Sequence, residues 1–291
     1  MRLFLIRHAE SEHNVAQVYA GTTDSALTNH GMVQIQRLAL HFKEQGIEFT
    51  TVFSSDLLRA RITAEGICSL VGGEQQSRVG TQTSPVILPL LREKDFGCLE
   101  GKSWLATRGG DGKSGAETMA GDPESQASIA SRVDMFLTNH LLPVVSDMGH
   151  TAQSVAVVSH GVLLSALWEA LSRLFLSTHV ILGPNVEVGR RISSWSNTGY
   201  LELAVGRLVE DKSSKPAPAM VDGQGNRKDA SNKTQVVDNA PTPVLSGYAM
   251  TVLTINGKQH LHNLRRTPGV GRSKHDASQK RIDSFFQRPK N

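Results

Sequence analysis

The sequence is poor in cysteine and contains no long apolar run. Its two cysteines, Cys68 and Cys98, are too few and too far apart to indicate a disulfide framework or a metal cluster, which favours a reducing compartment such as the cytosol or the nucleus. No run approaches the roughly 18 apolar residues that a membrane span requires. The opening MRLFLIRHAE has only a short apolar stretch between Arg2 and Arg7 and no small-residue cleavage site, so we expect no signal peptide.

Composition allows one large domain or two smaller ones, because 291 residues with 39% hydrophobic content suffice for a sizeable core. The formal net charge of +4 is unevenly placed. From Lys258 to Asn291 there are nine Lys and Arg against two acidic residues (+7), and the other 22 Lys and Arg and 25 Asp and Glu leave −3 for residues 1–257. Such a basic end is typical of a solvated, disordered tail.

Short apolar runs alternate with helical patterns along the chain. The apolar runs are 3–6, 155–159 and 200–205. The helical patterns are 31–43, 56–71, 125–145 and 162–176. This alternation predicts an α/β domain with a mostly parallel sheet.

The C-terminal third shows different patterns. Residues 211–243 are rich in Lys, Ser, Pro, Asn, Asp and Gly, and we interpret them as a disordered insert. The dipeptide Asn256-Gly257 then predicts a tight hairpin that returns to the edge of the same sheet, with His260 and His262 in its edge strand. We therefore expect one domain over residues 1–264 and a basic flexible tail over 265–291.

Cationic and proton-donating side chains follow the predicted strands. Arg7-His8 and Ser159-His160 each come directly after a strand, and ligands in open α/β sheets bind beyond the carboxyl ends of the strands. Arg59, one turn into a helix, can point into the same crevice. Guanidinium groups match phosphate oxygens, and the helix that Gly161 opens adds free N–H groups, so the sequence predicts an anion site.

Four stretches together resemble the signature blocks of the histidine phosphatase superfamily, in its phosphoglycerate mutase-like branch: RHAESEHN, SSDLLRARITA, LREKDFGCLEG and VVSHG. The resemblance covers the catalytic blocks of residues 1–205 in order and spacing. It implies a three-layer αβα sandwich and hydrolysis of phosphomonoesters through a phosphohistidine. It implies no cofactor, and the sequence shows no metal-binding motif.

The resemblance also implies roles for individual residues. His8 matches the nucleophile, Glu93 the general acid, and Arg7, Arg59 and His160 the groups that hold the phosphate. The chemistry agrees, because neighbouring arginines lower the pKa of His8 and neutralise the transferring phosphoryl group. Further positions match the lining of the phosphate pocket, namely Asn14, Gly21 and Thr22.

Two other functions remain open at this stage. A phosphoglycerate mutase would carry, after the LEG block, an insertion with paired arginines that grip a substrate carboxylate, and the residues after Gly101 lack it. The stretch GDPESQASIASRV instead resembles the block of the phosphatase members, with Glu124, Ser125 and Arg132 in place and Asp122-Pro123 as a departure. A scaffold that keeps the phosphatase fold is disfavoured, because it has no chemical need for the full catalytic set. The substrate class beyond a phosphomonoester stays open.

The tail ends SQKRIDSFFQRPKN, in which four residues have the spacing of a peptide that docks on the replication sliding clamp, or PIP-box: Gln279, Ile282, Phe285 and Phe286. In that mode a helical turn places the apolar side chains on one face to fill a groove. The alternatives are that residues 279–286 fold back onto the catalytic domain or form an unrelated basic tail with at most weak nucleic-acid contact.

Overall fold

The computed structural model describes residues 1–71, 84–107, 121–147, 153–186, 195–208 and 243–276. The strands within these ranges are β1 (Arg2–Arg7), β2 (Thr51–Ser54), β3 (Val86–Ile87), β4 (Ser154–Ser159), β5 (Val180–Leu182), β6 (Tyr200–Arg207) and β7 (Tyr248–Gly257). The helices are α1 (Glu12–Ala16), α2 (Asn29–Glu44), α3 (Leu58–Val71), α4 (Trp104–Thr107), α5 (Gln126–Phe136), α6 (Leu142–Ser146) and α7 (Gly161–Arg173). The short helical turns are η1 (Pro89–Leu91), η2 (Gly97–Leu99), η3 (Leu137–Leu141), η4 (Ser177–His179), η5 (Gln259–Leu261) and η6 (Val270–Arg272).

These strands form one seven-stranded sheet in the order β3-β2-β4-β1-β6-β7-β5. Only β6 runs antiparallel to its neighbours β1 and β7, and the other adjacent pairs are parallel. β1 and β4 lie beside each other in the middle and are apolar along most of their length, as is typical of parallel strands covered on both faces. The predicted mostly parallel α/β fold is confirmed.

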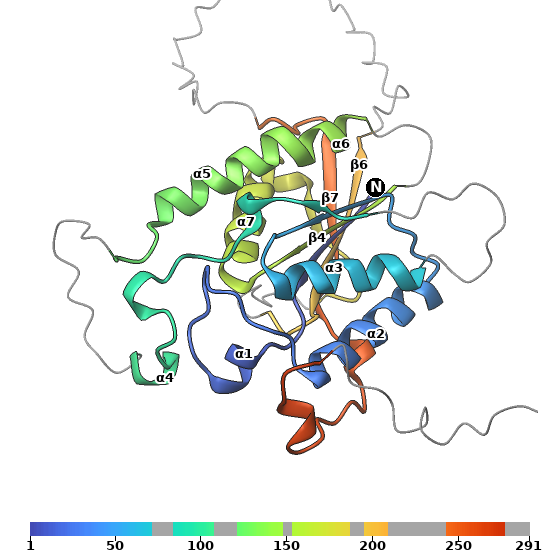
Figure 1. Ribbon diagram of the computed structural model, residues 1–291. Coiled ribbons are helices and arrows are strands. Elements are labelled where there is room, and N and C mark those ends of the chain that lie inside the picture. Colours follow the sequence, from blue (N-terminus) through green and yellow to red (C-terminus); the bar gives the residue numbers. More distant parts are fainter. Residues whose placement is uncertain (72–83, 108–120, 148–152, 187–194, 209–242, 277–291) are drawn as a thin grey trace, which may run out of the picture.

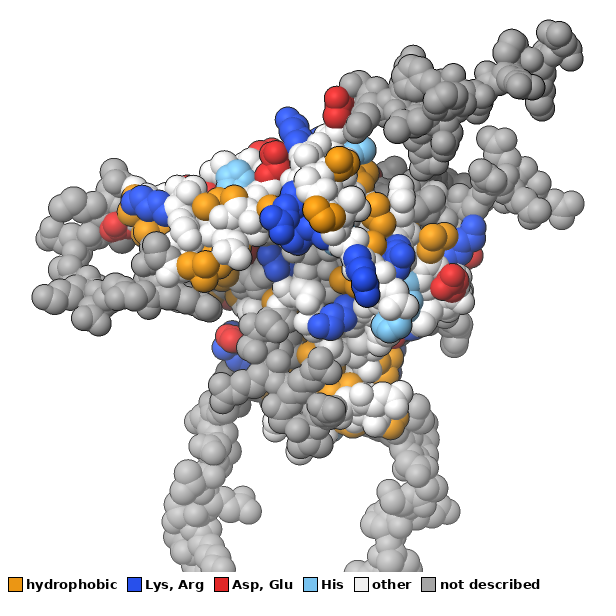
Figure 2. Space-filling view, turned by 90° about the horizontal axis from the view of Figure 1, so that it is seen from below, with side chains coloured by type: hydrophobic (Ala, Val, Ile, Leu, Met, Phe, Trp, Pro, Cys, Tyr) orange, Lys and Arg blue, Asp and Glu red, His pale blue; other side chains and the backbone are white. Residues whose placement is uncertain are grey.

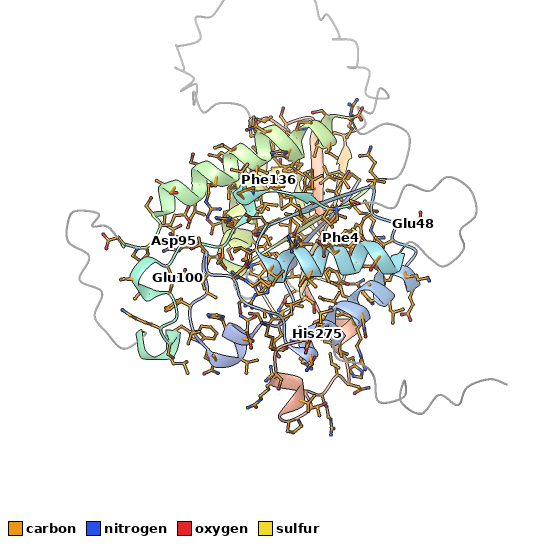
Figure 3. The ribbon with its side chains drawn as sticks, viewed as in Figure 1. Phe4, Glu48, Asp95, Glu100, Phe136 and His275 are labelled. Carbon is orange, nitrogen blue, oxygen red and sulfur yellow. The ribbon has the colours of Figure 1, made fainter. Side chains whose placement is uncertain are left out.

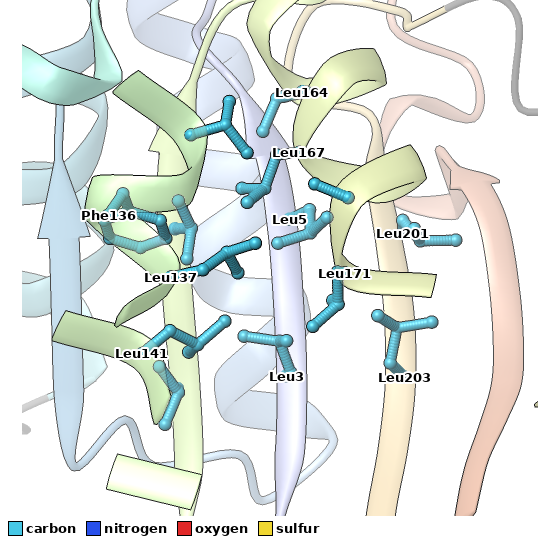
Figure 4. Packing of buried hydrophobic residues seen from close by; sticks show 14 of the residues in the cluster. Leu3, Leu5, Phe136, Leu137, Leu141, Leu164, Leu167, Leu171, Leu201 and Leu203 are labelled. Atoms are coloured by element: carbon cyan, nitrogen blue, oxygen red, sulfur yellow. The ribbon is translucent and has the colours of Figure 1, made fainter. Parts of the chain in front are cut away.

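Helices cover both faces of the sheet (Figure 1). On one face, α5 and α7 pack against alternate residues of β1, including Leu3 and Leu5, as Figure 4 shows. On the other face, α2 and α3 pack against Phe4 and Ile6 of the same strand. Because successive strand residues point to opposite faces, the single run LFLI supplies both cores.

The predicted helices are present with shifted ends. The pattern at 31–43 lies inside α2, which the side chain of Thr28 caps by accepting a hydrogen bond from Gly31 N at 3.0 Å. The pattern at 125–145 is divided into α5, the π-turn η3 and α6. Pro143 explains the break, since proline has no N–H to donate to the preceding turn.

The predicted hairpin at Asn256-Gly257 is wrong. β7 ends at Gly257 and continues into η5, so His260 lies in a helical turn and not in an edge strand. Asn256 has φ +47°, as a turn residue would, but its side chain accepts a hydrogen bond from Ser196 N at 2.9 Å. That contact ties the end of β7 to the segment before β6, and β7 already has β6 and β5 as its neighbours.

Residues 265–276, which the sequence assigned to the tail, contact the domain in the structure. Arg266 pairs with the buried carboxylate of Glu10. The backbone N–H of His275, labelled in Figure 3, donates to the carbonyl oxygen of Leu27 at 2.9 Å. Figure 2 shows Lys and Arg side chains spread over the face that contains this segment. The domain therefore extends to residue 276. The predicted insert, apart from Pro243, and the motif at 279–286 lie outside the described residues.

Candidate active site

The carboxyl ends of β1 and β4 bring two histidines together. Arg7 and Ser159 are paired in register across these parallel strands, so His8 and His160, the next residues, lie side by side. Their ring centroids are 5.0 Å apart, and both side chains are buried. Neither ring nitrogen of His160 has a hydrogen-bond partner among the described residues, which leaves a buried donor available to a ligand.

Hydrogen bonding selects the tautomer of His8. Its Nδ1 lies 2.7 Å from the carbonyl oxygen of Ala9. A carbonyl oxygen only accepts, so Nδ1 carries the proton, and Nε2 of the neutral ring has a free lone pair. An imidazole in this state is a nucleophile.

Burial keeps both rings neutral. Burial lowers the pKa of His8 well below its ordinary value, and the nearby charges of Arg59 and Arg7 lower it further. Burial, with Arg59 as the next cause, likewise lowers the pKa of His160 well below the ordinary value. His8 is therefore neutral at pH 7, with Nε2 free of a proton.

Two arginines, Arg7 and Arg59, supply the positive charge. Arg59 is 1% exposed and donates to the carbonyl oxygens of Thr23, Ala20 and Gly21, each at 2.8 Å. Burial lowers the pKa of Arg59 to about 10, so it is still charged at neutral pH. Arg7 donates through Nη1 to the carbonyl oxygen of Trp195 at 2.6 Å, and its buried Nε has no partner in the part of the chain that the structure describes.

Glu93 binds the amino end of α7. Its carboxylate accepts hydrogen bonds from the N–H groups of Val162 and Leu163, both at 3.1 Å, and from Lys94 N at 2.9 Å. The helix that begins at Gly161 thus has an anion at its start, as expected, but these two amides bind the carboxylate of this chain and not a ligand. The arrangement holds the predicted general acid beside His160.

Glu100 binds the backbone amides of Gly21 and Thr22, the positions that the resemblance placed in the lining of the phosphate pocket. Its carboxylate accepts from Gly21 N at 2.9 Å and from Thr22 N at 3.2 Å. Neither Gly21 nor Thr22 lines the cavity described below, whereas Asn14 does. Figure 3 labels Glu100 and Asp95 on the segment between η1 and α4. Through these two amides, Glu100 fixes the loop whose carbonyl oxygens accept hydrogen bonds from Arg59.

The block at 121–133, which resembles that of the phosphatase members, contacts and positions the segment that carries Glu93. Arg132 pairs with Glu124 at 2.8 Å, and its Nη1 donates to the carbonyl oxygens of Leu90 at 2.8 Å and Arg92 at 3.0 Å. Ser125 caps α5 by accepting from Ser128 N at 3.1 Å. These residues position the site from outside the cavity.

Sequence reasoning missed Asn197 and Thr198. Asn197 Nδ2 donates to the carbonyl oxygen of His8 at 3.1 Å and to Asn14 Oδ1 at 2.9 Å. Thr198 N donates to the carbonyl oxygen of Arg7 at 3.0 Å. The only local signal was the polar run SSWSNTG directly before an apolar strand, which is also typical of an ordinary loop.

A cavity of about 250 Å³ is lined by most of these groups, and His160 lies beside His8 without lining it. Its lining consists of the polar and charged residues His8, Arg7, Arg59, Glu93 and Asn14 and of the residues Val18, Tyr19, Ala20, Phe96 and Trp104. The described residues contain no group of three or more His, Cys, Asp and Glu side chains placed to hold a metal ion. None of the described helices has the length and apolar character needed to cross a membrane.

Comparisons with known proteins identify the family and several relatives of this chain. The model of the histidine phosphatase superfamily (branch 1) matches residues 3–188. A Schizosaccharomyces pombe protein named "Probable phosphatase C1620.13" is 26% identical over 283 residues, covering 97% of this chain and 78% of the relative. A 2,3-bisphosphoglycerate-dependent phosphoglycerate mutase of Rhizobium etli is 30% identical over 179 residues, covering 59% of this chain and 80% of the relative. The solved structure "Mycobacterial hydrolase 1" shares the fold, with a TM-score of 0.58 at 18% identity over 88% of this chain and 99% of that one.

Proposed function

Because the chain belongs to branch 1 of the histidine phosphatase superfamily, we propose that it is a phosphatase that hydrolyses phosphomonoesters through a phosphohistidine on His8. The observation that carries this proposal is the His8 ring in the cavity, with Nδ1 bonded to the carbonyl oxygen of Ala9 and with Arg7 and Arg59 beside it. This arrangement is what an in-line attack on phosphorus needs.

In the proposed first step, Nε2 of His8 attacks the phosphorus atom, a P–N bond forms, and the P–O bond to the alcohol breaks. Glu93, in its carboxylic acid form, gives its proton to the departing oxygen. Arg7, Arg59 and His160 donate to the three phosphoryl oxygens, whose charge is shared across the transition state. In the second step Glu93 takes a proton from water, which attacks the phosphohistidine and releases inorganic phosphate and neutral His8.

Hydrolysis is favoured over mutase transfer by the charge of the cavity. Arg7 and Arg59 are its only cationic lining residues in the described part of the chain, and both act electrostatically on His8. A mutase substrate such as phosphoglycerate also carries a carboxylate, and a buried carboxylate needs a cationic partner of its own. The relative named as a phosphatase also covers 97% of the chain, against 59% for the mutase.

The test is to trap the intermediate. Incubation with a phosphate-labelled phosphomonoester and rapid quenching is expected to yield a phosphoenzyme that is labile to acid and stable to base, and His8→Ala is expected to abolish it. A base-labile or His8-independent adduct would contradict the mechanism. Transfer of label to phosphoglycerate faster than to water would favour the mutase alternative.

The proposed mechanism requires no metal, because two guanidinium groups supply the charge on the phosphoryl oxygens. EDTA treatment is expected to leave kcat unchanged. Loss of activity that added Mg²⁺ or Zn²⁺ restores would overturn this part of the proposal. The proposed cellular site is the cytosol or the nucleus, which imaging of the tagged full chain tests.

A further inference from the structure

One wall of the catalytic cavity is aromatic, and phosphoryl transfer does not account for it. Tyr19, Phe96 and Trp104 line the cavity together with Val18. The ring centroids of Tyr19 and Phe96 are 4.6 Å apart, and those of Tyr19 and Trp104 are 6.5 Å apart with planes at 73°. All three rings are half-buried, so each keeps an accessible surface. We call these four residues the aromatic wall.

The backbone holds this wall in place without a substrate. Tyr19 N donates to the carbonyl oxygen of Lys102 at 2.9 Å, and Gly101 N donates to that of Tyr19 at 2.9 Å. Val18 forms a β-bridge with Ser103, and Trp104 N donates to the carbonyl oxygen of Gln17 at 3.2 Å. The segments 17–19 and 101–104 are thus joined by a short ladder of backbone hydrogen bonds.

Glu100 joins the same two segments from the side. Its carboxylate accepts from Gly21 N at 2.9 Å and from Phe96 N at 3.1 Å. Gly21 lies so close that an added Cβ would be 2.9 Å from Cδ2 of Phe96. A wall preorganised in this way loses little conformational entropy when a ligand contacts it.

Two groups of lining residues differ in chemistry. Arg7, Arg59 and Glu93 are charged, whereas the four residues of the aromatic wall contribute no charged side chain to the lining. Lys94 Nζ lies 6.0 Å from the ring centroid of Phe96 but does not line the cavity. An apolar or aromatic group gains from contact with the faces of these rings.

The size of the cavity suits a small alcohol group. Its volume of about 250 Å³ lies just below the range of roughly 300–1,000 Å³ that is usual for small-molecule sites. A phosphate and one ring joined by a short linker match this volume better than a nucleotide or an oligosaccharide phosphate.

We propose that the aromatic wall selects phosphomonoesters whose alcohol carries a single aromatic ring close to the phosphate. This inference rests on the phosphatase function proposed above. The phosphoryl group lies against His8, Arg7 and Arg59, and the ring of the alcohol packs against Phe96 and Tyr19. Selection is exerted on binding, and no additional chemical step is involved.

The test compares 2-phenylethyl phosphate with ethyl phosphate. Both are esters of primary alcohols with similar leaving-group acidity, so a difference in kcat/KM reports contact with the ring. The phenylethyl ester is expected to be hydrolysed with a kcat/KM about tenfold higher, as burial of one ring against aromatic side chains allows. Equal kcat/KM values for the two esters would overturn the inference.

Substitutions in the aromatic wall test whether these residues cause the preference for the phenylethyl ester. Phe96→Leu keeps an apolar side chain without the ring and is expected to reduce severalfold the ratio of kcat/KM for the phenylethyl ester to kcat/KM for ethyl phosphate. Leu105→Ala is the matched control, because Leu105 follows Trp104 on α4, is 57% exposed and does not line the cavity. A preference that survives Phe96→Leu, Tyr19→Leu and Trp104→Leu would contradict the assignment to this wall.

Binding of the corresponding phosphonates separates this inference from the proposed function. Calorimetry with 2-phenylethylphosphonate and ethylphosphonate needs no turnover and can use both the wild-type protein and His8→Ala. Tighter binding of the phenylethyl compound supports the wall even if no phosphohistidine forms. Equal affinity of the two phosphonates overturns the inference even if the enzyme hydrolyses phosphomonoesters.

Discussion

Asn197 holds the backbone of His8 from a position 189 residues further along the chain, where its side-chain amide donates to the carbonyl oxygen of His8 at 3.1 Å. Its neighbour Thr198 is fully buried and has φ +56°, a left-handed conformation that is rare for a β-branched residue. Such strain persists only where the surroundings enforce it. Here Thr198 Oγ1 lies 2.9 Å from Nε2 of His260, and Thr198 N reaches the carbonyl oxygen of Arg7.

Asn197→Ala is expected to lower kcat for phosphomonoesters by about tenfold, because it leaves the carbonyl oxygen of His8 with one fewer donor and frees the nucleophile to shift. Ser196→Ala in the same turn is the control, since the Ser196 side chain contacts Asn256 and not His8. Steady-state kinetics with both variants checks this. A kcat as high in Asn197→Ala as in the control would show that the contact does not position His8.

Gly21→Ala is expected to destabilise the protein by about 1–3 kcal/mol, because the new Cβ would lie 2.1 Å from the carbonyl oxygen of Lys94 and the backbone must move. The same movement displaces the carbonyl oxygen that Arg59 binds, so activity also falls. Gly206→Ala is the control, since a Cβ there meets nothing within 4 Å and φ is not positive. Urea unfolding measures both variants. Similar free energies of unfolding would refute the steric argument.

His260 makes stability depend on pH in the acidic range. Burial, followed by the neighbouring His41 and Arg37, lowers the pKa of His260 to about 3, against 6.5 for an ordinary histidine. Below pH 6.5 the unfolded chain therefore binds a proton that the folded protein does not, and stability falls as the pH falls. Between pH 7 and pH 5 this one group removes about 2 kcal/mol.

His260→Gln keeps a group that can bond Thr198 and removes the titration. Urea unfolding at pH 7 and pH 5 is expected to show a smaller loss of stability in the variant than in the wild type, by about 2 kcal/mol. An equal loss in both proteins would show that His260 is not the group that titrates. The comparison uses each protein's own value at pH 7, so a general destabilisation by the substitution does not affect it.

The tail motif at 279–286 stays a prediction that truncation can test. Removal of residues 279–291 is expected to abolish binding to purified sliding clamp while phosphatase activity and Tm stay unchanged. Phe285→Ala with Phe286→Ala in the full chain is expected to have the same effect, since these side chains fill the apolar groove in this mode. A lower Tm after truncation would indicate instead that the tail packs on the domain.

The sequence alone determined where the catalytic groups are placed on the sheet. Arg7-His8 and His160 follow apolar runs, and parallel strands bring their carboxyl ends to one edge, so local pattern and one topological rule suffice to predict their meeting. The helices were predictable for the same reason, because a repeat of apolar residues along one face is a local property.

Only the tertiary structure decided which partners the polar groups take. The amides of Gly21 and Thr22 bind Glu100, and the amides that open α7 bind Glu93, although local sequence offered all of them to phosphate. Asn256 has the backbone of a hairpin turn but pairs with Ser196. In each case, donors and acceptors from segments far apart in sequence compete for the same partner. Most buried polar groups are paired, and the packed chain determines which partner is within reach.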